Sequence, residues 1–319
     1  MEEKRPATAM TYDDAGEPAP KRRVNPYRLA LLLLAVGFII VSAVLIVNML
    51  GYLSAQNEYS ELQEYSQAQE DSAALLITEA PMGTEAQIPP PTQPSAPREQ
   101  ATAESQVTPE PKAFSSGQVA WLMQKNKDTV AWLDVLGTKI QYPVVQTDNN
   151  EYYVTHTFQK QKNSSGAIFL DCWNAPNFDD FNVVIYGHNM KDGSMFHQLR
   201  QYEQQSFADS HLDIQVTLSD RKLHFKVFSA YVSEGEEIAD FRGFDCQTEN
   251  QRSAFIRAAR KRSVIDSRLT VSRHDRLLSL VTCTSGTHTW YWVVHAVLVD
   301  EQTTVQSTSL EPNPRSGFL

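Results

Sequence analysis

The chain has 319 residues, a formal net charge of −10 and three cysteines. Its length corresponds to about two folded units of roughly 150 residues each, and its 41% hydrophobic content excludes a wholly disordered protein. The acidic balance argues against a nucleic-acid partner, because phosphate binding needs a basic surface. Three cysteines without a CxxC pair exclude a disulfide framework and disfavour structural zinc. Since no acidic cluster suited to calcium is present either, we expect no cofactor and no metal.

An uncharged run of 19 residues, 29–47, begins the patterned part of the chain, and MLGYL extends it after Asn48. A helix of this length covers the roughly 30 Å hydrocarbon core of a bilayer. A cleaved signal peptide is the alternative, with Leu53-Ser54-Ala55 as a weak cleavage site, but the apolar region of a signal is usually about 7–15 residues long. We therefore predict a retained transmembrane anchor over 29–53.

The cations that flank this run predict its orientation. Six lysines and arginines lie within residues 1–28, whereas none follows the run before Arg98. The positive-inside rule then places 1–28 in the cytoplasm and the rest of the chain outside, as a single-pass protein of the cell membrane.

An extracellular stalk and Pro-rich linker are predicted over 54–113. Residues 56–78 form either a short helix that continues from the anchor or a solvated stalk. Eight of the sixteen prolines then lie between Pro81 and Pro111, a composition typical of a semi-extended spacer.

A globular domain is predicted over 114–302, followed by a tail at 303–319. Val119, Leu122 and Met123 have helical spacing and predict a first amphipathic helix that ends near Asn126. A second helix is expected over about 248–262, with a buried face that contains Phe255, Ile256 and Ala259.

Eight short runs rich in β-branched and aromatic residues predict strands in this domain. No GxGxxG motif, P-loop or internal repeat accompanies them. We therefore predict a mainly β domain, either a closed barrel or a sandwich. The runs are VAWLDV, KIQYPVVQ, GAIFLD, NVVIYGH, LDIQVTL, LHFKVFSAYV, LLSLVTC and WYWVVHAVLV.

Two apolar runs end in residues that carry chemistry, His188 and Cys283. A thiol reacts as its thiolate, which a neighbouring cation favours, and a histidine from another strand is its usual partner in proton transfer. A cysteine at a strand end is otherwise most often a small buried apolar residue, as we expect for Cys172 and Cys246. His197 lies nine residues after His188, a spacing that matches no common metal-ligand motif.

Several blocks between about 128 and 300 go beyond these general patterns. They are TVAWL at 129–133, YPVVQTDN at 142–149, SSGAIFLD at 164–171, YGHNMKDGSMF at 186–196 and SLVTCT at 279–284. Together they resemble the class B sortases, the cysteine transpeptidases of Gram-positive cell surfaces. The last block is similar to the family's TLxTC pattern, with Ser279 at the first threonine.

The resemblance implies an eight-stranded sortase-type β-barrel with a few peripheral helices and a groove for an extended peptide. Cys283 would be the nucleophile and His188 its acid–base partner, with Thr282, Ser279 and Asn189 as substrate contacts. The implied substrates are secreted proteins with a C-terminal LPxTG-like or NPxTN-like sorting signal. The implied acceptor amine belongs to a peptidoglycan precursor or to a pilin lysine.

The chain departs from the family at one position. The arginine found eight residues after the cysteine in many class B sortases corresponds to Tyr291, and no arginine occurs between Cys283 and Arg315. The arginine in this family helps to bind the peptide and the developing oxyanion. The replacements left open are Tyr291 itself, His288 or Thr289, or Arg273 or Arg276 from before the cysteine strand; for these two arginines, an ordinary charged loop is the favoured interpretation.

Two hypotheses follow. In the first, the protein is a working cysteine transpeptidase whose third catalytic part has been replaced. In the second, it is a catalytically impaired sortase-like domain that binds sorting signals or assists pilus or cell-wall assembly. Retention of Cys283 and His188 favours the first, and Tyr291 favours the second. A cysteine hydrolase that releases peptides to water would use the same residues.

Overall fold

The computed structural model describes residues 26–78, 115–233, 241–283 and 290–303. The predicted cytoplasmic segment up to residue 25, the Pro-rich linker 79–113 and the tail beyond residue 303 lie outside the described residues. The chain divides into two compact units, Met1–Met49 and Leu50–Leu319.

The predicted anchor belongs to one long helix, α1 (Pro26–Thr78). Its Tyr27–Tyr65 part is the one stretch of the described chain that is long and apolar enough to cross a membrane. Residues 56–78 continue the same helix, so the helical alternative for this segment agrees with the structure.

Within the second unit, α1 contributes to the core. Ala55, Tyr59 and Leu62 are 6% exposed or less, and their spacing of four and three residues places them on one face of the helix. The Tyr59 hydroxyl donates to the Gly166 carbonyl at 2.7 Å. The Tyr65 ring stacks on Trp121 with centroids 3.8 Å apart. The helix is therefore part of the folded domain from about residue 55.

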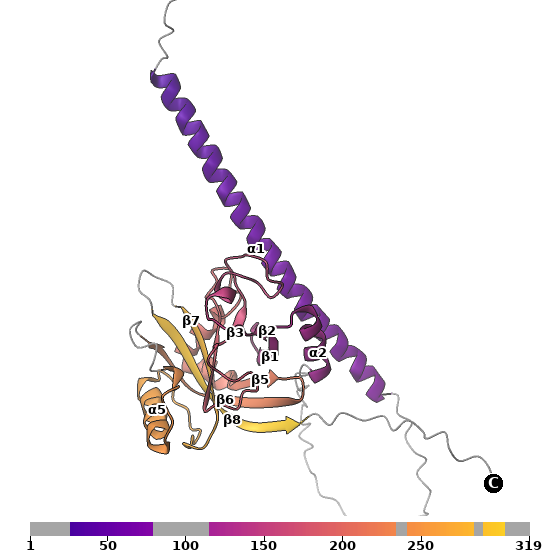
Figure 1. Ribbon diagram of the computed structural model, residues 1–319. Helices are drawn as coiled ribbons and strands as arrows, with labels where there is room; N and C mark the ends of the chain where they lie inside the picture. The colour runs from indigo at the N-terminus through magenta and orange to yellow at the C-terminus, as the bar shows by residue number, and fades with distance from the viewer. Residues whose placement is uncertain (1–25, 79–114, 234–240, 284–289, 304–319) are drawn as a thin grey trace, which may run out of the picture. The chain divides into compact units, whose positions relative to one another are not determined.

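Eight strands of the described chain form a closed barrel in the order β1-β2-β3-β4-β7-β8-β6-β5 (Figure 1). The β2/β3 and β4/β7 pairs are parallel and the other pairs are antiparallel. Each predicted run corresponds to one strand, so the mainly β barrel is confirmed. The strands are β1 (Thr129–Val135), β2 (Gln141–Val145), β3 (Ile168–Leu170), β4 (Asn182–Tyr186), β5 (Asp213–Thr217), β6 (Arg221–Ser233), β7 (Leu277–Cys283) and β8 (Tyr291–Thr303).

The first predicted helix is α2 (Ser116–Lys125). Ser115 caps its N-terminus in a capping box, in which the Ser115 and Gln118 side chains each accept a hydrogen bond from the other residue's backbone N–H. Val119 and Leu122 are buried, whereas Met123 is 39% exposed. Trp121, which lies beside them in the sequence, stacks on Tyr65 of α1. Other short helical segments of the described chain include η1 (Tyr152–Val154), η2 (His197–Glu203) and α3 (Gln205–Ser210).

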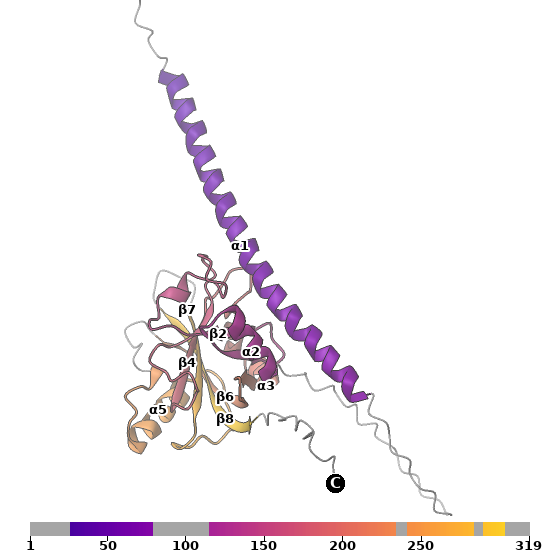
Figure 2. The same ribbon diagram turned by 45° about the vertical axis from the view of Figure 1, so that its right-hand side comes forward.

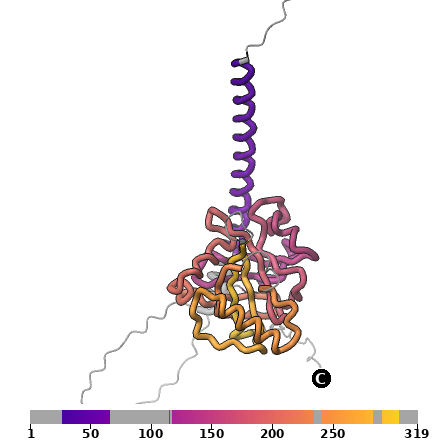
Figure 3. The backbone as a smooth tube through the Cα atoms, turned by 90° about the vertical axis from the view of Figure 1, so that its left-hand side faces the viewer, coloured from indigo at the N-terminus to yellow at the C-terminus, as the bar shows by residue number. Residues whose placement is uncertain are grey.

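The strands β4 and β7, and β8 over its first half, bury both of their faces. Side chains alternate across a strand, and alternate residues belong to two different clusters: Leu278 and Leu280 pack in the large core, whereas Leu277 and Val281 pack in a second cluster. The second cluster is covered by α5 (Glu249–Arg262), the second predicted helix. Figure 3 shows the orange segment that contains α5 in front of the yellow strands.

The residues predicted to form the buried face of α5 do so. Phe255, Ile256 and Ala259 are 9% exposed or less and belong to the second cluster. Thr248 caps the helix N-terminus. The basic residues in its last turn stabilise the helix, because they lie at the partly negative C-terminal end of the helix dipole.

Candidate active site

Two adjacent parallel strands bring His188 and Cys283 to the same end of the barrel. In the β4/β7 register, Tyr186 lies opposite Val281, and the Gly187 N–H donates to the Val281 carbonyl at 3.1 Å. His188 and Cys283 each come two residues after the Tyr186–Val281 pair, at the carboxyl ends of β4 and β7. Figure 2 shows these two strands next to each other. The strand-end pairing predicted from the sequence is therefore present in the backbone.

Tyr291, the residue aligned with the family arginine, lies next to Cys283 on the neighbouring strand. Cys283 and Tyr291 are register partners of β7 and β8. Tyr291, the residue that the ungapped comparison of sequences aligns with the family arginine, therefore lies beside the cysteine in the backbone of the sheet.

A cavity of about 360 Å³ opens beside these strand ends. Its walls combine apolar side chains with a few polar groups, the arrangement typical of a binding site. Among the residues predicted for the site, it includes His188, Thr282 and Tyr291. The lining residues are Asn150, Val154, Phe169, Tyr186, Gly187, His188, Phe241, Arg242, Val281, Thr282 and Tyr291.

One ring nitrogen of His188 is held by the backbone. Nε2 lies 2.7 Å from the Val154 carbonyl oxygen, which can only accept, so Nε2 carries the proton in this contact. In the neutral imidazole, Nδ1 is then the acceptor. Gly166 packs beneath this ring: a Cβ at its position would lie 3.1 Å from His188 Cδ2 and 2.7 Å from the Val154 carbonyl oxygen.

Thr282 carries an unsatisfied polar atom beside the cavity. The residue is 1% exposed, and its hydroxyl has no hydrogen-bond partner among the described residues. A buried hydroxyl without a partner is disfavoured by roughly 1–3 kcal/mol. A polar group of a bound molecule would remove this penalty, so Thr282 fits a ligand contact.

A buried carboxylate contacts two of the residues that line the cavity. Asp171 is fully buried; it accepts from the Tyr186 hydroxyl at 2.8 Å, and its Oδ2 lies 3.8 Å from Arg242 Nη1. Burial first, and then the charge of Asp171, raise the pKa of Tyr186, which keeps this phenol a neutral donor at physiological pH.

Hydrogen bonds from β4 hold the backbone around Arg242 in place. The Asn182 side-chain amide donates to the carbonyls of Phe241 and Arg242 at 3.0 and 2.9 Å. Its carbonyl oxygen accepts from the Ser279 hydroxyl at 2.7 Å. The cavity wall is thus attached to β4 and, through Asn182, to β7.

Comparison with known proteins assigns the domain. The Sortase domain family matches residues 133–299, just over half of the chain. The chain belongs to the sortase family.

The relatives that this sortase matches are of class B. Sortase B of Listeria monocytogenes is 36% identical over 166 residues, which make up 51% of this chain and 65% of that protein. Sortase B of Staphylococcus aureus is 32% identical over 158 residues, 50% of this chain and 64% of the relative. The sortase thus spans slightly less than two thirds of the length of both relatives.

A solved structure extends the match to the fold. A Staphylococcus aureus sortase B–substrate complex has a TM-score of 0.54 at 30% sequence identity, covering 58% of this chain and 86% of that one. The predicted resemblance to class B sortases and the sortase-type barrel are both confirmed.

Two residues predicted as substrate contacts do not line the cavity of this sortase. Ser279 is fully buried, and its hydroxyl lies between Asn182 and His295 Nδ1, 2.7 Å from each partner. Ser279 thus joins strands and is not accessible to a peptide. The Asn189 Oδ1 atom lies 2.8 Å from His197 Nδ1, a contact within the loop after β4.

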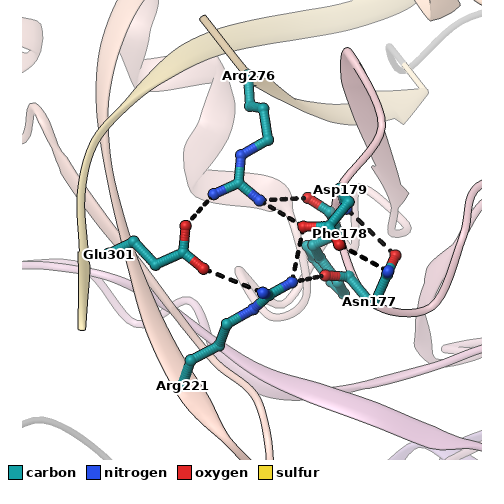
Figure 4. Close-up of polar contacts among 6 residues, drawn as sticks. All are labelled: Asn177, Phe178, Asp179, Arg221, Arg276 and Glu301. Carbon is teal, nitrogen blue, oxygen red and sulfur yellow. Dashed lines mark hydrogen bonds and ion pairs between the residues drawn. The ribbon is translucent and has the colours of Figure 1, made fainter. Parts of the chain in front are cut away.

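The arginines that precede the cysteine strand are engaged elsewhere in the sortase. Arg276 pairs with Asp179 and with Glu301, in a cluster that Arg221 completes (Figure 4). Arg273 pairs with Glu249 at the start of α5 at 2.8 Å. The favoured interpretation of both as charged loop residues agrees with these contacts. His288 and Thr289 lie outside the described residues.

Sequence reasoning missed Arg242, the one lysine or arginine among the described residues that line the cavity. It lies in a short helical stretch at 241–242 that no strand or motif pattern indicates in the sequence, so only the fold brings it to the site. The described residues of the sortase contain no group of three or more His, Cys, Asp or Glu side chains that could hold a metal.

Proposed function

We propose that this sortase is a membrane-anchored cysteine transpeptidase that cleaves an LPxTG-like or NPxTN-like sorting signal and transfers the protein to an amine. The observation that carries the proposal is the placement of His188 and Cys283 at the ends of adjacent parallel strands beside a cavity. The sortase B relatives and the substrate complex of one of them support the same reaction class.

In the first half-reaction, the Cys283 thiolate attacks the threonine carbonyl of the signal. The C–N bond of the following peptide link breaks and a thioester forms. His188, as the imidazolium, gives its proton to the leaving amine. Because Val154 holds Nε2, Nδ1 is the nitrogen that delivers the proton.

In the second half-reaction, an amine attacks the thioester carbonyl. His188 accepts a proton from the incoming amine, an amide bond forms and the thiolate leaves, which restores the starting state. The amine comes from a peptidoglycan precursor or a pilin lysine. Thr282, with its buried and unsatisfied hydroxyl, contacts the peptide during both steps.

The reaction takes place at the outer face of the cell membrane. Residues 29–53 act as a single-pass anchor, with the N-terminus in the cytoplasm, as the positive-inside rule requires. The substrates are secreted proteins that carry the signal, and nucleic acid has no part in this function.

One observation favours a second candidate. Tyr291 stands beside Cys283 where many class B sortases have arginine, and loss of one oxyanion donor typically lowers kcat by about 10²–10³. In this alternative the domain binds sorting signals, or assists assembly, without turnover.

Intact mass spectrometry of the full-length chain in detergent separates the candidates. The protein is incubated with LPxTG-like and NPxTN-like peptides, with and without glycinamide, beside a Cys283→Ala control. We expect an added mass equal to the N-terminal peptide fragment, absent in the control, and an amide product when glycinamide is present.

Other outcomes decide against this function. Release of free acid that glycinamide does not divert would identify a hydrolase. Peptide binding without adduct or cleavage would support the binding protein, most directly if Tyr291→Arg then gains turnover. A folded protein that neither binds nor cleaves either peptide contradicts both candidates.

A further inference from the structure

The cavity beside His188 and Thr282 has a guanidinium on its wall although Tyr291 replaces the family arginine. Arg242 lines the same cavity as these three residues, and its side chain is 27% exposed. It comes from the segment before α5 and not from β8. The positive charge therefore comes from a different part of the chain than the family arginine would, but it lines the same cavity as Tyr291.

Several contacts hold Arg242 in place. Its backbone carbonyl accepts from Asn182, a residue with 2% exposure. Its guanidinium lies 3.8 Å from the fully buried Asp171 carboxylate and, at Cζ, 5.7 Å from the centre of the Phe244 ring. A cation held in advance at the wall of a cavity stabilises negative charge more than a freely solvated one does.

The Asp171 carboxylate does not use the whole guanidinium. Its Oδ2 also accepts from Tyr186, and the distance to Arg242 is longer than that of a direct hydrogen bond. An arginine has five N–H donors in a planar fork, so its guanidinium can hold several partners at once.

We propose that Arg242 supplies the guanidinium of this active site and binds the threonine carbonyl of the sorting signal and the oxyanion that develops from it. The inference rests on the proposed function. It assigns the role to a residue on another element than the one that carries the family arginine, and it would account for turnover with tyrosine at position 291. Arg273 and Arg276 are engaged in ion pairs elsewhere.

The test compares variants of the full-length chain in detergent by kcat/KM on the peptide that forms the Cys283 adduct. Arg242→Gln should lower kcat/KM by about 10²–10³. Arg242→Lys should retain part of it, since it keeps the charge but not the fork. Arg273→Gln is the matched control, an arginine in an exposed ion pair, and should stay within about twofold of the parent.

A rescue variant separates catalysis from folding. Arg242→Gln combined with Tyr291→Arg restores a guanidinium beside Cys283 and should regain at least about tenfold over Arg242→Gln alone. Thermal unfolding of each variant shows whether loss of the Asp171 contact has unfolded the domain. Loss without rescue in a folded protein, or an Arg242→Gln variant that equals Arg273→Gln, overturns the inference and leaves the proposed function standing.

A binding measurement covers the case in which the parent shows no turnover, so that the proposed function fails. Fluorescence anisotropy compares peptide binding by Cys283→Ala with binding by Cys283→Ala/Arg242→Gln. Loss of a charge-assisted contact should weaken binding by about tenfold or more. Equal affinities, or absence of binding by both, would overturn the role of Arg242 as well.

Discussion

Asp134 is a carboxyl group in the wall of the barrel, with 7% exposure. It lies in β1 opposite Gln141 of β2 and Gln215 of β5. Its Oδ1 and the Gln215 Oε1 both lack a partner among the described residues. Burial raises the pKa of Asp134 to about 6, against the lowering effect of its bond with Gln141. A proton on Asp134 would let it donate to Gln215, so the folded state favours the protonated acid.

Asp134→Asn should therefore stabilise the protein at neutral pH. The folded-state pKa of about 6 exceeds the ordinary aspartate pKa of 3.8, so the contribution of Asp134 is most favourable below pH 3.8 and is lost as the pH rises through 6. Above pH 6 the charged form costs on the order of 3 kcal/mol. Urea unfolding at pH 7.5 should show a gain that disappears at pH 4.

The exposed Asp266 supplies the control for this experiment. Asp266→Asn changes the same charge without burial and should leave the unfolding free energy within about 0.5 kcal/mol at both pH values. A loss of stability in Asp134→Asn at pH 7.5 would contradict the protonation argument.

Gly166 is required by two constraints that act together. Its φ is +57°, and a Cβ would lie 2.6 Å from the Tyr153 carbonyl oxygen and 3.1 Å from the His188 ring. Gly166→Ala should therefore displace the histidine and lower kcat/KM by about tenfold or more, the effect expected of an ångström-scale misplacement. Peptide turnover and thermal unfolding measure the two effects separately.

Gly193 offers a matched comparison, because its φ is +86° but no atom would lie within 4 Å of a Cβ at this position. Gly193→Ala carries the backbone strain alone, about 1 kcal/mol, and should keep its turnover. If both variants lose turnover equally, the close approach to His188 has no special role.

At the scale of elements, a polar network crosses the strands beneath α5. His295 of β8 contacts the Ser279 hydroxyl through Nδ1 at 2.7 Å and the Tyr231 hydroxyl through Nε2 at 3.0 Å. Asn182 of β4 completes it. Burial, and then the charge of Arg262, lower the pKa of His295 to about 3. The network therefore depends on a neutral imidazole.

This network should make the barrel sensitive to acid. The unfolded His295 titrates near the ordinary histidine pKa of 6.5, while the folded one stays neutral down to about 3. Its stabilisation is thus complete above pH 6.5 and is lost as the pH falls toward 3. Between pH 6.5 and 5 the loss amounts to about 2 kcal/mol. His295→Gln should reduce this part of the pH dependence in urea unfolding.

An exposed histidine distinguishes this effect from general acid denaturation. His274 has a side chain that is 62% exposed, and His274→Gln should leave the acid slope of the parent unchanged. An acid slope of His295→Gln that equals the parent's would mean that the buried imidazole contributes nothing to it.

At the scale of the whole molecule, α1 joins the apolar segment to the barrel as one continuous helix. The part from Leu50 onward belongs to the compact unit of the barrel. Tyr59 makes two hydrogen bonds within this unit: it donates to Gly166 and accepts from the Phe158 N–H at 3.3 Å. Glu58, which is 8% exposed, accepts from the Gln159 N–H at 2.8 Å.

A chain that begins at Leu50 should therefore be more stable than one that begins at Ser115. Burial of Tyr59 and Leu62 contributes about 1.5–3 kcal/mol for each side chain, which corresponds to a difference in Tm of about 6–24 °C for a domain of this size. Differential scanning calorimetry measures it. Tyr59→Ala in the longer chain should give an intermediate Tm, and equal Tm values for the two chains would contradict the packing role of α1.

The sequence predicted most of what is encoded locally. Strand alternation and turn residues indicated the eight strands, and two apolar runs that end in His188 and Cys283 indicated where they meet. The packing of α1 was left open, because Leu62 and Tyr65 stand in a polar segment and their partners are distant in the chain. Arg242 was missed for the same reason: its neighbour Asp171 is 71 positions away, and no local pattern links them.

The attachment of the cavity wall has a consequence for protein engineering. Asn182 fixes the backbone of Phe241 and Arg242 while it accepts a hydrogen bond from the core. A mutant library restricted to the cavity surface would vary the side chains that recognise a peptide but leave the backbone that carries them unmoved. Changes at Ser279 would instead shift that backbone through Asn182. Selection for a new peptide preference should therefore enrich substitutions there, at a position that no substrate reaches.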